Sequence, residues 1–374
     1  MVRSNETAEQ PRPGSGPLSG LRVVELASIG PGPHCGMLLS DLGAEIIRVE
    51  REGGIGRPNP IVDRGRARTV CDITTPGGRD WCLDAIEHAD VLVEGMRPGV
   101  MERLGLGPEE CHARNPALIY ARMTGWGQDG PMARMAGHDI NYIGLTGALA
   151  AIGRPGEPAS IPLNLVGDFG GGSLYLVLGI LAALFERQRT GRGQVIDAAI
   201  VDGTASLMTF FYGLTQTGGM NLERGKNLLG GAAPFYRTYL CSDGKEIAVG
   251  ALEPKFFREL VTRLGMPELV ERQYDTSCWP ELMATFEGVF AAEPRDHWAT
   301  MFAGTDACLT PVLDHTEVAE DPQMKSRGIR GNEKGVTDVP PAPRFSRFEP
   351  CDATAGPQDA QALLEEWKRT ERRG

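Results

Sequence analysis

Two side chains that commonly move protons lie next to glycines in this sequence. His138 follows Gly137 in AGHDINYIG, residues 136–144, and the chain has only 6 histidines. Asp168 precedes three consecutive glycines in NLVGDFGGGS, where a long apolar helix is expected to begin. An imidazole exchanges protons near neutral pH, and so does a carboxylate whose pKa is raised by its surroundings. Together the two residues suggest a site for proton transfer.

Each of the two residues also has a structural explanation. A lone histidine in a loop is usually held by ordinary hydrogen bonds. Gly137 allows a sharp turn before His138, and Asn141 and Tyr142 are able to supply orienting hydrogen bonds. These local features permit catalysis without deciding in its favour.

Asp168 is placed to act as an N-cap, because a carboxylate before a helix accepts an N–H of the first turn. That role does not explain Gly170, Gly171 and Gly172, since each glycine costs up to roughly 1 kcal/mol relative to alanine in a helix. Close helix packing would explain them. So would an oxyanion held by bare N–H groups at the positive end of the helix dipole. The residues alone leave both explanations open.

A second carboxylate, Glu253, lies at a predicted strand end in VGALEPKFF, directly before Pro254. Glutamate beside a proline at the first helical position is usually a plain helix-start residue. That structural interpretation is favoured on the residues alone.

The composition is that of a globular protein, with 41% apolar and 23% charged residues in 374 positions. This length suffices for two domains. The net charge of −11 argues against nucleic acid as a partner, which requires a basic face, but allows a local basic pocket for one anion.

Neither a membrane nor an exported location is predicted. The longest apolar run, residues 174–185, has 12 residues, whereas a spanning helix needs about 20. Residues 1–17 lack the apolar core of a signal peptide and are expected to be a disordered lead-in. The 8 cysteines form no CxxC pair, which indicates reduced, packed thiols rather than a zinc site or disulfides. We therefore expect a cytoplasmic protein.

Strands and helices alternate through the first part of the chain. Apolar, β-branched runs predict strands at 21–28, 45–50, 67–73, 90–96 and 118–126, with helices between them. This alternation predicts a doubly wound, mostly parallel α/β sheet. A dinucleotide is excluded as the cofactor, because the first turn, IGPGPHCG, lacks G-x-G-x-x-G and its prolines remove N–H donors.

The second part of the chain predicts a smaller α/β unit. A helix is expected at about 169–188, and a strand that runs into another helix at 193–203. Residues 236–252 form a hairpin pattern around SDGK, followed by two helical patterns, a short strand at 308–313 and a terminal amphipathic helix.

Several long motifs, in the same order, resemble the α-methylacyl-CoA racemase branch of the family III CoA-transferase superfamily. The resemblance covers residues 17–347 and rests on PLSGLRVVELASIGPGPHCGMLLSDLGAEIIRVER, IYARMTGWGQDGP, AGHDINYIGLTGAL, PLNLVGDFGGGS, GQVIDAAIVDG and GGAAPFYRTYLCSDGKEIAVGALEPKFF. It implies a Rossmann-like large domain and a small domain joined by long linkers, in an interlocked homodimer.

The resemblance also implies the domain limits and a site shared by two subunits. The large domain would span 18–216 and be completed by 330–374, and the small domain would span 235–318. A linker at 217–234 would join them, and the segment 319–374 would return to the large domain and pack on it. The active site would form where the large domain of one subunit meets the small domain of the other.

The activity implied is inversion of the α-carbon of 2-methylacyl-CoA thioesters, in fatty acid metabolism, by 1,1-proton transfer through an enolate. His138, paired with Glu253, and Asp168 match the family's two bases. The enolate oxygen would be held by main-chain N–H groups at the glycine-rich helix start, those of Asp168, Gly170 and Gly171. No metal or organic cofactor is implied, because CoA is part of the substrate.

The CoA portion would be bound by Arg51 and Arg103, with Arg97 as a weaker match, since a guanidinium binds phosphate bidentately. Residues 52–68 and Cys35 depart from the family pattern. A buried thiol is the ordinary interpretation of Cys35, which receives no catalytic role. The acyl group (branched fatty, sterol or arylpropionyl), the pathway and the preferred epimer stay open.

The main alternative is CoA transfer, in which an aspartate matching Asp168 is the nucleophile and forms an acyl anhydride. The combination of GHDINY with GALEP favours the racemase, because transfer needs no second proton base. A non-catalytic acyl-CoA-binding protein is a further alternative, against which the presence of all three site residues argues.

Overall fold

The computed structural model of the chain describes residues 16–54, 56–348 and 359–370. Its contacts divide the chain into two compact units. The first holds the chain up to Thr146, Leu163–Leu207 and the chain from Thr337 onward, and the second holds Gly147–Pro162 and Met208–Val336. The expected lead-in, residues 1–17, falls almost entirely outside the described residues.

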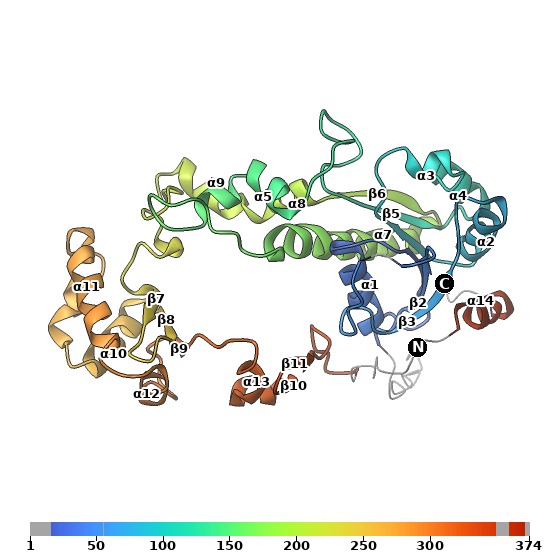
Figure 1. The fold of residues 1–374 in the computed structure, drawn as a ribbon. Helices are drawn as coiled ribbons and strands as arrows, with labels where there is room; N and C mark the ends of the chain where they lie inside the picture. The colour runs from blue at the N-terminus through green and yellow to red at the C-terminus, as the bar shows by residue number, and fades with distance from the viewer. Residues whose placement is uncertain (1–15, 55, 349–358, 371–374) are drawn as a thin grey trace, which may run out of the picture. The chain divides into compact units, whose positions relative to one another are not determined.

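The first unit is built on a six-stranded parallel sheet with the strand order β3-β2-β1-β4-β5-β6 (Figure 1). The strands are β1 Arg22–Leu26, β2 Glu45–Glu50, β3 Arg66–Val70, β4 Val91–Glu94, β5 Ile119–Thr124 and β6 Gln194–Ala199. The order reverses between β1 and β4, as in doubly wound folds, so that the carboxyl ends of these strands flank a crevice. The predicted parallel α/β sheet is confirmed.

Helices cover both faces of this sheet. They are α1 Pro31–Asp41, α2 Pro76–Glu87, α3 Val100–Arg103, α4 Pro108–Arg114, α5 Asp139–Leu145, α7 Leu174–Thr190, α8 Ile200–Leu207 and α14 Ala360–Arg369. One apolar core lies among α2, α4 and α14, and the other among α1, α5 and α7. The central strands β1, β4 and β5 are buried on both sides, which explains why most of their residues are apolar.

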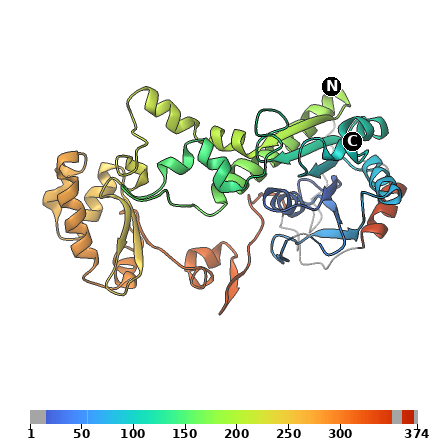
Figure 2. The ribbon, with the colours of Figure 1, turned by 45° about the horizontal axis from the view of Figure 1, so that its top comes forward.

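The C-terminal helix α14 packs beside α2 and against β2 and β3 (Figures 1 and 2). Trp367 is 1% exposed, and its Nε1 donates to Glu45 Oε2 at 2.7 Å. Lys368 forms an ion pair of 2.8 Å with Asp84 on α2. The last helix is therefore part of the core of the first unit.

The helix that carries Asp168 begins earlier than predicted. A π-helix, Leu165–Ser173, continues directly into α7, so the helix starts at Leu165 rather than near 169. Asn164, not Asp168, occupies the N-cap position, and the N–H of Phe169 donates to Asn164 O at 3.3 Å. The wider π turn brings residues 165–168, which precede the predicted start, into the helix. The predicted N-cap role of Asp168 is therefore wrong.

The combined helix Leu165–Thr190 has 26 residues, which is long and apolar enough to cross a membrane by length and composition alone. The sequence prediction rested only on the apolar run 174–185, because the glycines before it were expected to mark the start of the helix. The helix itself is longer. The helix is amphipathic in its packing, since Leu176, Ile180 and Ala183 are buried against the sheet.

Close packing explains the most crowded of the three glycines. A Cβ on Gly171 would lie 2.5 Å from Thr204 Oγ1, and a Cβ on Gly203 of α8 would lie 1.8 Å from the carbonyl oxygen of Gly171. The π-helix and α8 thus meet backbone against backbone. Of the two explanations that the sequence left open for this glycine, helix packing is confirmed.

The second unit contains an antiparallel sheet of β7 Tyr236–Leu240, β8 Glu246–Gly250 and β9 Leu309–Pro311. Its helices are α6 Ala148–Ala151, α9 Thr209–Gln216, α10 Pro254–Arg263, α11 Trp279–Phe290, α12 Arg295–Met301 and α13 Pro322–Ser326, with a small β10–β11 pair at Arg330–Asn332 and Gly335–Asp338. An aromatic core around Phe235, Phe257 and Phe286 fills this unit. The predicted hairpin is confirmed by the antiparallel pair of β7 and β8.

The unit boundaries differ from the expected domain limits of 18–216 and 235–318. Gly147–Pro162 groups with the second unit, because Arg224 donates to the carbonyl oxygens of Ala150 at 2.8 Å and Glu157 at 3.0 Å. The change from the first to the second unit falls after Leu207, and the return falls after Val336.

Candidate active site

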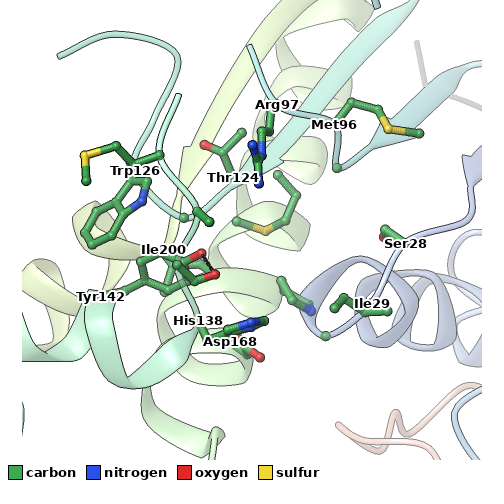
Figure 3. Close-up of a pocket in the computed structure, with 18 of the residues that line it drawn as sticks. Ser28, Ile29, Met96, Arg97, Thr124, Trp126, His138, Tyr142, Asp168 and Ile200 are labelled. Atoms are coloured by element: carbon green, nitrogen blue, oxygen red, sulfur yellow. Dashed lines mark hydrogen bonds between the residues drawn. The ribbon is translucent and has the colours of Figure 1, made fainter. Parts of the chain in front are cut away.

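A cavity of about 470 Å³ lies at the carboxyl ends of β1, β4 and β5. The segments that follow these strands, Ser28–Pro31, Gly95–Pro98 and Met123–Trp126, form most of its wall (Figure 3). His138, Asn164 and Asp168 also line the cavity, together with Ala133, Met135, Ala136, Gly137, Tyr142 and Ile200. The crevice at the reversal of strand order is where ligands bind in folds of this type.

His138 occupies the N-cap of α5, and its side chain is exposed toward the cavity. Asn141 Oδ1 accepts the main-chain N–H of His138 at 3.0 Å. The hydroxyl of Tyr142 donates to Gly137 O at 2.5 Å, the dashed line in Figure 3. The orienting hydrogen bonds predicted for Asn141 and Tyr142 are therefore made to the backbone at His138 and Gly137.

Asp168 is half-buried at the same end of the cavity (Figure 3). Its Oδ2 accepts a hydrogen bond from Asn164 Nδ2 at 3.1 Å, and its main-chain N–H donates to Asp139 Oδ2 at 2.8 Å. Burial raises the pKa of Asp168. The Asn164 hydrogen bond opposes this shift, the charge of Asp139 adds to it, and His138 opposes it. A carboxylate in these surroundings is a stronger base than one in water.

Gly30, at the N-cap of α1, lets the backbone approach the Asp168 carboxylate. Its φ is +69°, and a Cβ on it would lie 2.9 Å from Asp168 Oδ2. Pro31 follows at the first position of α1 and also lines the cavity. The Gly/Pro turn that excluded a dinucleotide therefore places a backbone without a side chain beside Asp168.

The three arginines predicted to bind CoA lie in different surroundings. Arg97 lines the cavity directly after β4. Arg103 ends α3, and its Nη1 lies 3.3 Å from the position of a Cβ on Gly99, so its guanidinium folds back toward the Arg97 loop. Arg51 is exposed and donates from Nε to Gly54 O at 3.2 Å.

The loop that carries Arg97 is held by Glu94. Oε2 of Glu94 accepts the N–H of Met96 at 2.6 Å, and the carboxylate lies beside Arg122. Burial raises the pKa of Glu94 to about 7, against lowering by the Met96 hydrogen bond and by Arg122. Sequence analysis did not identify this carboxylate.

A second cavity, of about 420 Å³, shares Ser28, Ile29, Gly30 and Asn164 with the first. Its wall includes Gly53, Gly54, residues 56–59, Val62 and Asp63, and it combines apolar residues with the polar and charged side chains of Arg48, Arg57, Asn59 and Arg68. Described residues of the segment that departs from the family pattern thus contribute to the wall of a cavity that adjoins the first.

Glu253 belongs to the second unit, where it is the N-cap of α10 with Pro254 at the first helical position. Its side chain makes no capping hydrogen bond to its own helix. A helix-start role explains why a residue at position 253 precedes Pro254, but it gives the Glu253 carboxylate no hydrogen bond and no function.

Asn164 and Asp139 are the site residues that sequence analysis missed. Asn164 precedes Asp168 by one helical turn, and this spacing is the one signal that could have revealed it. Asp139 lies beside His138 and carries no pattern of its own. Among the described cysteines, Cys35, Cys82, Cys111 and Cys241 are free and buried as predicted, whereas Cys71 and Cys278 are half-buried and Cys308 is exposed.

Comparison with known proteins identifies the family. A family model described as CoA-transferase family III matches residues 18–357. The α-methylacyl-CoA racemase of Mus musculus is 46% identical over 333 residues, 88% of this chain and 87% of the mouse protein. The human racemase is 46% identical over 326 residues, 86% of this chain and 85% of the human protein.

A solved structure shows the same fold over nearly the whole chain. A CAIB/BAIF family protein from Brucella suis is 30% identical, with a TM-score of 0.79, and the match covers 94% of this chain and 100% of that one. The resemblance inferred from the motifs is confirmed: the chain belongs to CoA-transferase family III.

Proposed function

We propose that the protein is a racemase that inverts the α-carbon of 2-methylacyl-CoA thioesters. The observation that carries this proposal is that His138 and Asp168 line one cavity at the switch point of the sheet. Two proton-transfer groups in one cavity suit removal of a proton from one face of a carbon and its return on the other. The names of the mouse and human relatives support the same substrate class.

The reaction requires strong bases, because the α-proton of a thioester is far less acidic than any side chain at neutral pH. The burial that raises the pKa of Asp168 therefore favours its role as a base. A well-placed base contributes about 10²–10⁴-fold to the rate. In one direction His138 removes the proton and Asp168 returns one, and in the other direction the roles exchange.

The predicted oxyanion role of Gly170 and Gly171 needs correction. These residues lie inside the π-helix rather than in its first turn, and helical N–H groups in that position point back along the helix. The enolate oxygen therefore requires donors other than these two amides, and Asp168 acts in the first turn without capping it.

We propose that Arg97, at the cavity wall, binds a phosphate of the CoA portion. Arg103 and Arg51, which do not line this cavity, would bind phosphates farther from the thioester. Arg103 supports this assignment by folding back toward the Arg97 loop. The second cavity adjoins the first, and the guanidinium groups of Arg48, Arg57 and Arg68 in its wall suit the phosphates of the nucleotide end.

We further propose a homodimer whose active site is shared. Leu174, Leu178 and Phe185 form an apolar stripe on α7 with 52%, 61% and 65% exposure, and such stripes mark protein interfaces. Glu253 would orient His138 of the other subunit. Its carboxylate, which caps no helix, is consistent with such a role. A cytoplasmic location remains a prediction from the sequence.

The test of the function is α-proton exchange. The protein is incubated in D₂O with (2S)-2-methylacyl-CoA and no acceptor acid, and the α-position is followed by NMR together with chirality. Deuterium gain with loss of optical purity supports the racemase. Absence of exchange, with CoA transferred to an added carboxylic acid, would make Asp168 a nucleophile and the protein a transferase.

The shared site is tested by mixing variants. His138→Ala and Glu253→Ala homodimers are each expected to be inactive. Mixed dimers formed from both chains carry one site with neither substitution and should regain up to about a quarter of the wild-type rate per total subunit if chains pair at random. No recovery in verified mixed dimers would contradict pairing across subunits.

A further inference from the structure

Asp139 is a buried carboxylate that the proton transfer described above does not use. It is 6% exposed and is the first residue of α5, directly after His138. Its Oδ2 accepts the N–H of Asp168, whereas its Oδ1 is buried without a hydrogen-bond partner in the described part of the chain. Burying a charge with one oxygen unsatisfied costs free energy, so this residue requires a reason other than stability.

The chain leaves room for this carboxylate at Gly167. A Cβ on Gly167 would lie 2.3 Å from Asp139 Oδ2 and 2.8 Å from its Cγ. Any other residue at 167 would push the carboxylate away from the N–H of Asp168. The contact thus depends on two residues in different segments, one on α5 and one in the π-helix.

The hydrogen bond between Asp139 and Asp168 joins the two segments that carry the proposed bases. His138 is the neighbour of Asp139 along the chain, and Asp168 is itself the donor. One bond of 2.8 Å therefore limits the separation of the two backbones from which the bases reach the cavity. Proton transfer to carbon is sensitive to misplacement, and a shift of about 1 Å can reduce a rate 10²-fold.

Asp139 also acts on Asp168 through its charge. Burial has the largest effect on the pKa of Asp168, and the negative charge of Asp139 raises it further. The other polar and charged groups near Asp168 come from several elements: Asn164 before its own helix, His138 at the N-cap of α5, Tyr142 within α5, and Arg97 after β4.

We propose that Asp139 is a positioning residue, which holds Asp168 by its main-chain N–H and places an uncompensated negative charge beside the reacting carboxylate. This proposal rests on the role of Asp168 as a base. The negative charge of Asp139 makes Asp168 a stronger proton acceptor. In the reverse direction, the same charge lets Asp168 keep its proton at a higher pH.

Two substitutions separate the two effects. Asp139→Asn keeps an oxygen for the N–H of Asp168 and removes the charge, whereas Asp139→Ala removes both. In Asp139→Asn we expect kcat to fall about tenfold, KM to change less than about threefold, and the acidic limb of the kcat/KM profile to move to lower pH. In Asp139→Ala we expect kcat to fall about 10²-fold.

Asp90→Asn is the matched control. Asp90 is also a buried aspartate whose carboxylate accepts a main-chain N–H, that of Arg22 at 2.9 Å, and it does not line the cavity. Its substitution is expected to lower the melting temperature and to leave the acidic limb where it is. A purely structural role for Asp139 predicts the same behaviour for Asp139→Asn, and that result would overturn the proposal.

A direct titration makes the test independent of turnover. In protein labelled with ¹³C at the aspartate carboxyls, the resonance that disappears in Asp168→Asn belongs to Asp168, and its pKa is expected to be lower in Asp139→Asn than in the wild type. If the pKa of Asp168 in Asp139→Asn equals or exceeds that in the wild type, the proposal is overturned. This test holds even if Asp139→Ala fails to fold. Full activity in Asp168→Ala would instead show that the proposed mechanism fails, whatever Asp139 does.

Discussion

The side-chain amide of Asn164 donates a hydrogen bond to Oδ2 of Asp168 across 3.1 Å, one helical turn away. Asn164 also lines both cavities. A hydrogen bond donated to a carboxylate favours its charged form, so Asn164 opposes the burial that raises the pKa of Asp168. The proton affinity of this carboxylate is therefore set by competing neighbours.

Replacing Asn164 by alanine should raise the pKa of Asp168 further, because the charged form loses its donor. In the direction that needs ionised Asp168, activity falls as the pH drops through this pKa, so the acidic limb of kcat/KM should move to higher pH. The shift is expected to be about one pH unit at most, measured by initial rates over the acidic and neutral pH range. A limb that stays in place would contradict the assignment of this limb to Asp168.

Replacing Gly30 by alanine should impair catalysis more than stability. The new Cβ would lie 2.9 Å from Asp168 Oδ2, and displacement of the carboxylate should lower kcat about tenfold or more. Gly191→Ala is the control, because Gly191 has the same φ of +69° with nothing within 4 Å of a new Cβ. Equal kcat in both variants would show that the contact with Asp168 does not matter for turnover.

Replacing His138 or Asp168 by alanine should abolish inversion while the fold is retained. Each substitution is expected to lower the rate by about 10²–10⁴-fold. Loss of optical purity is measured beside deuterium incorporation, and circular dichroism verifies the fold. Near-wild-type turnover in either variant would remove that residue from the mechanism.

Replacing Glu94 by glutamine should change the pH dependence of stability. The pKa of Glu94 is raised to about 7 from 4.5, so in the wild type its contribution to stability is complete below about 4.5 and is lost as the pH rises through about 7. Glutamine cannot ionise. The melting temperature of Glu94→Gln relative to the wild type should therefore increase between about pH 4.5 and 8, by the equivalent of about 3 kcal/mol at most.

The exposed variant Glu109→Gln serves as the comparison for Glu94→Gln, since Glu109 lies at the surface in the first turn of α4. It should show no such trend. A difference for Glu94→Gln that is constant with pH would mean that Glu94 ionises in the folded protein as it does in the unfolded chain.

Replacing Leu178 by glutamate should separate the proposed dimer into monomers and reduce activity with it. A charge in an apolar interface costs several kcal/mol. Leu240→Glu is matched in exposure, at 61% for both leucines, and lies on β7 in the second unit. Sedimentation should show monomers for Leu178→Glu and dimers for Leu240→Glu. A Leu178→Glu dimer of normal stability would exclude this face as the interface.

The sheet was predictable because its strands carry the pattern of buried parallel strands. EIIRVE was expected as a strand and forms β2, Glu45–Glu50. What the pattern could not show is the cluster of buried charges between these strands, where Glu25 pairs with Arg48 at 3.2 Å and Arg66 at 2.9 Å. Such charges are tolerated only when tertiary contacts pair them.

The candidate site was predictable in its reacting groups and not in their support. Glycines next to His138 and Asp168 drew attention to both residues. The π-helix was not foreseen, because glycines usually mark a helix boundary and the i to i−5 pairing depends on packing against α8. Asp139 and Asn164 are ordinary polar residues in the sequence, because their roles depend on where the fold places Asp168. Asp139 accepts the main-chain N–H of Asp168, and Asn164 donates to its carboxylate. The roles of His138, Asp168 and Glu253 remain predictions.

The backbone contact between Gly171 and Gly203 limits how this protein can diversify. With only 1.8 Å between a Cβ on Gly203 and the carbonyl oxygen of Gly171, neither position can accept another amino acid without separating the two helices. In a library of random variants selected even weakly for a folded protein, both positions should remain glycine. New acyl preferences would then have to arise in the loops of the cavity wall, such as Met96 or Met135, and not in the helix that holds Asp168.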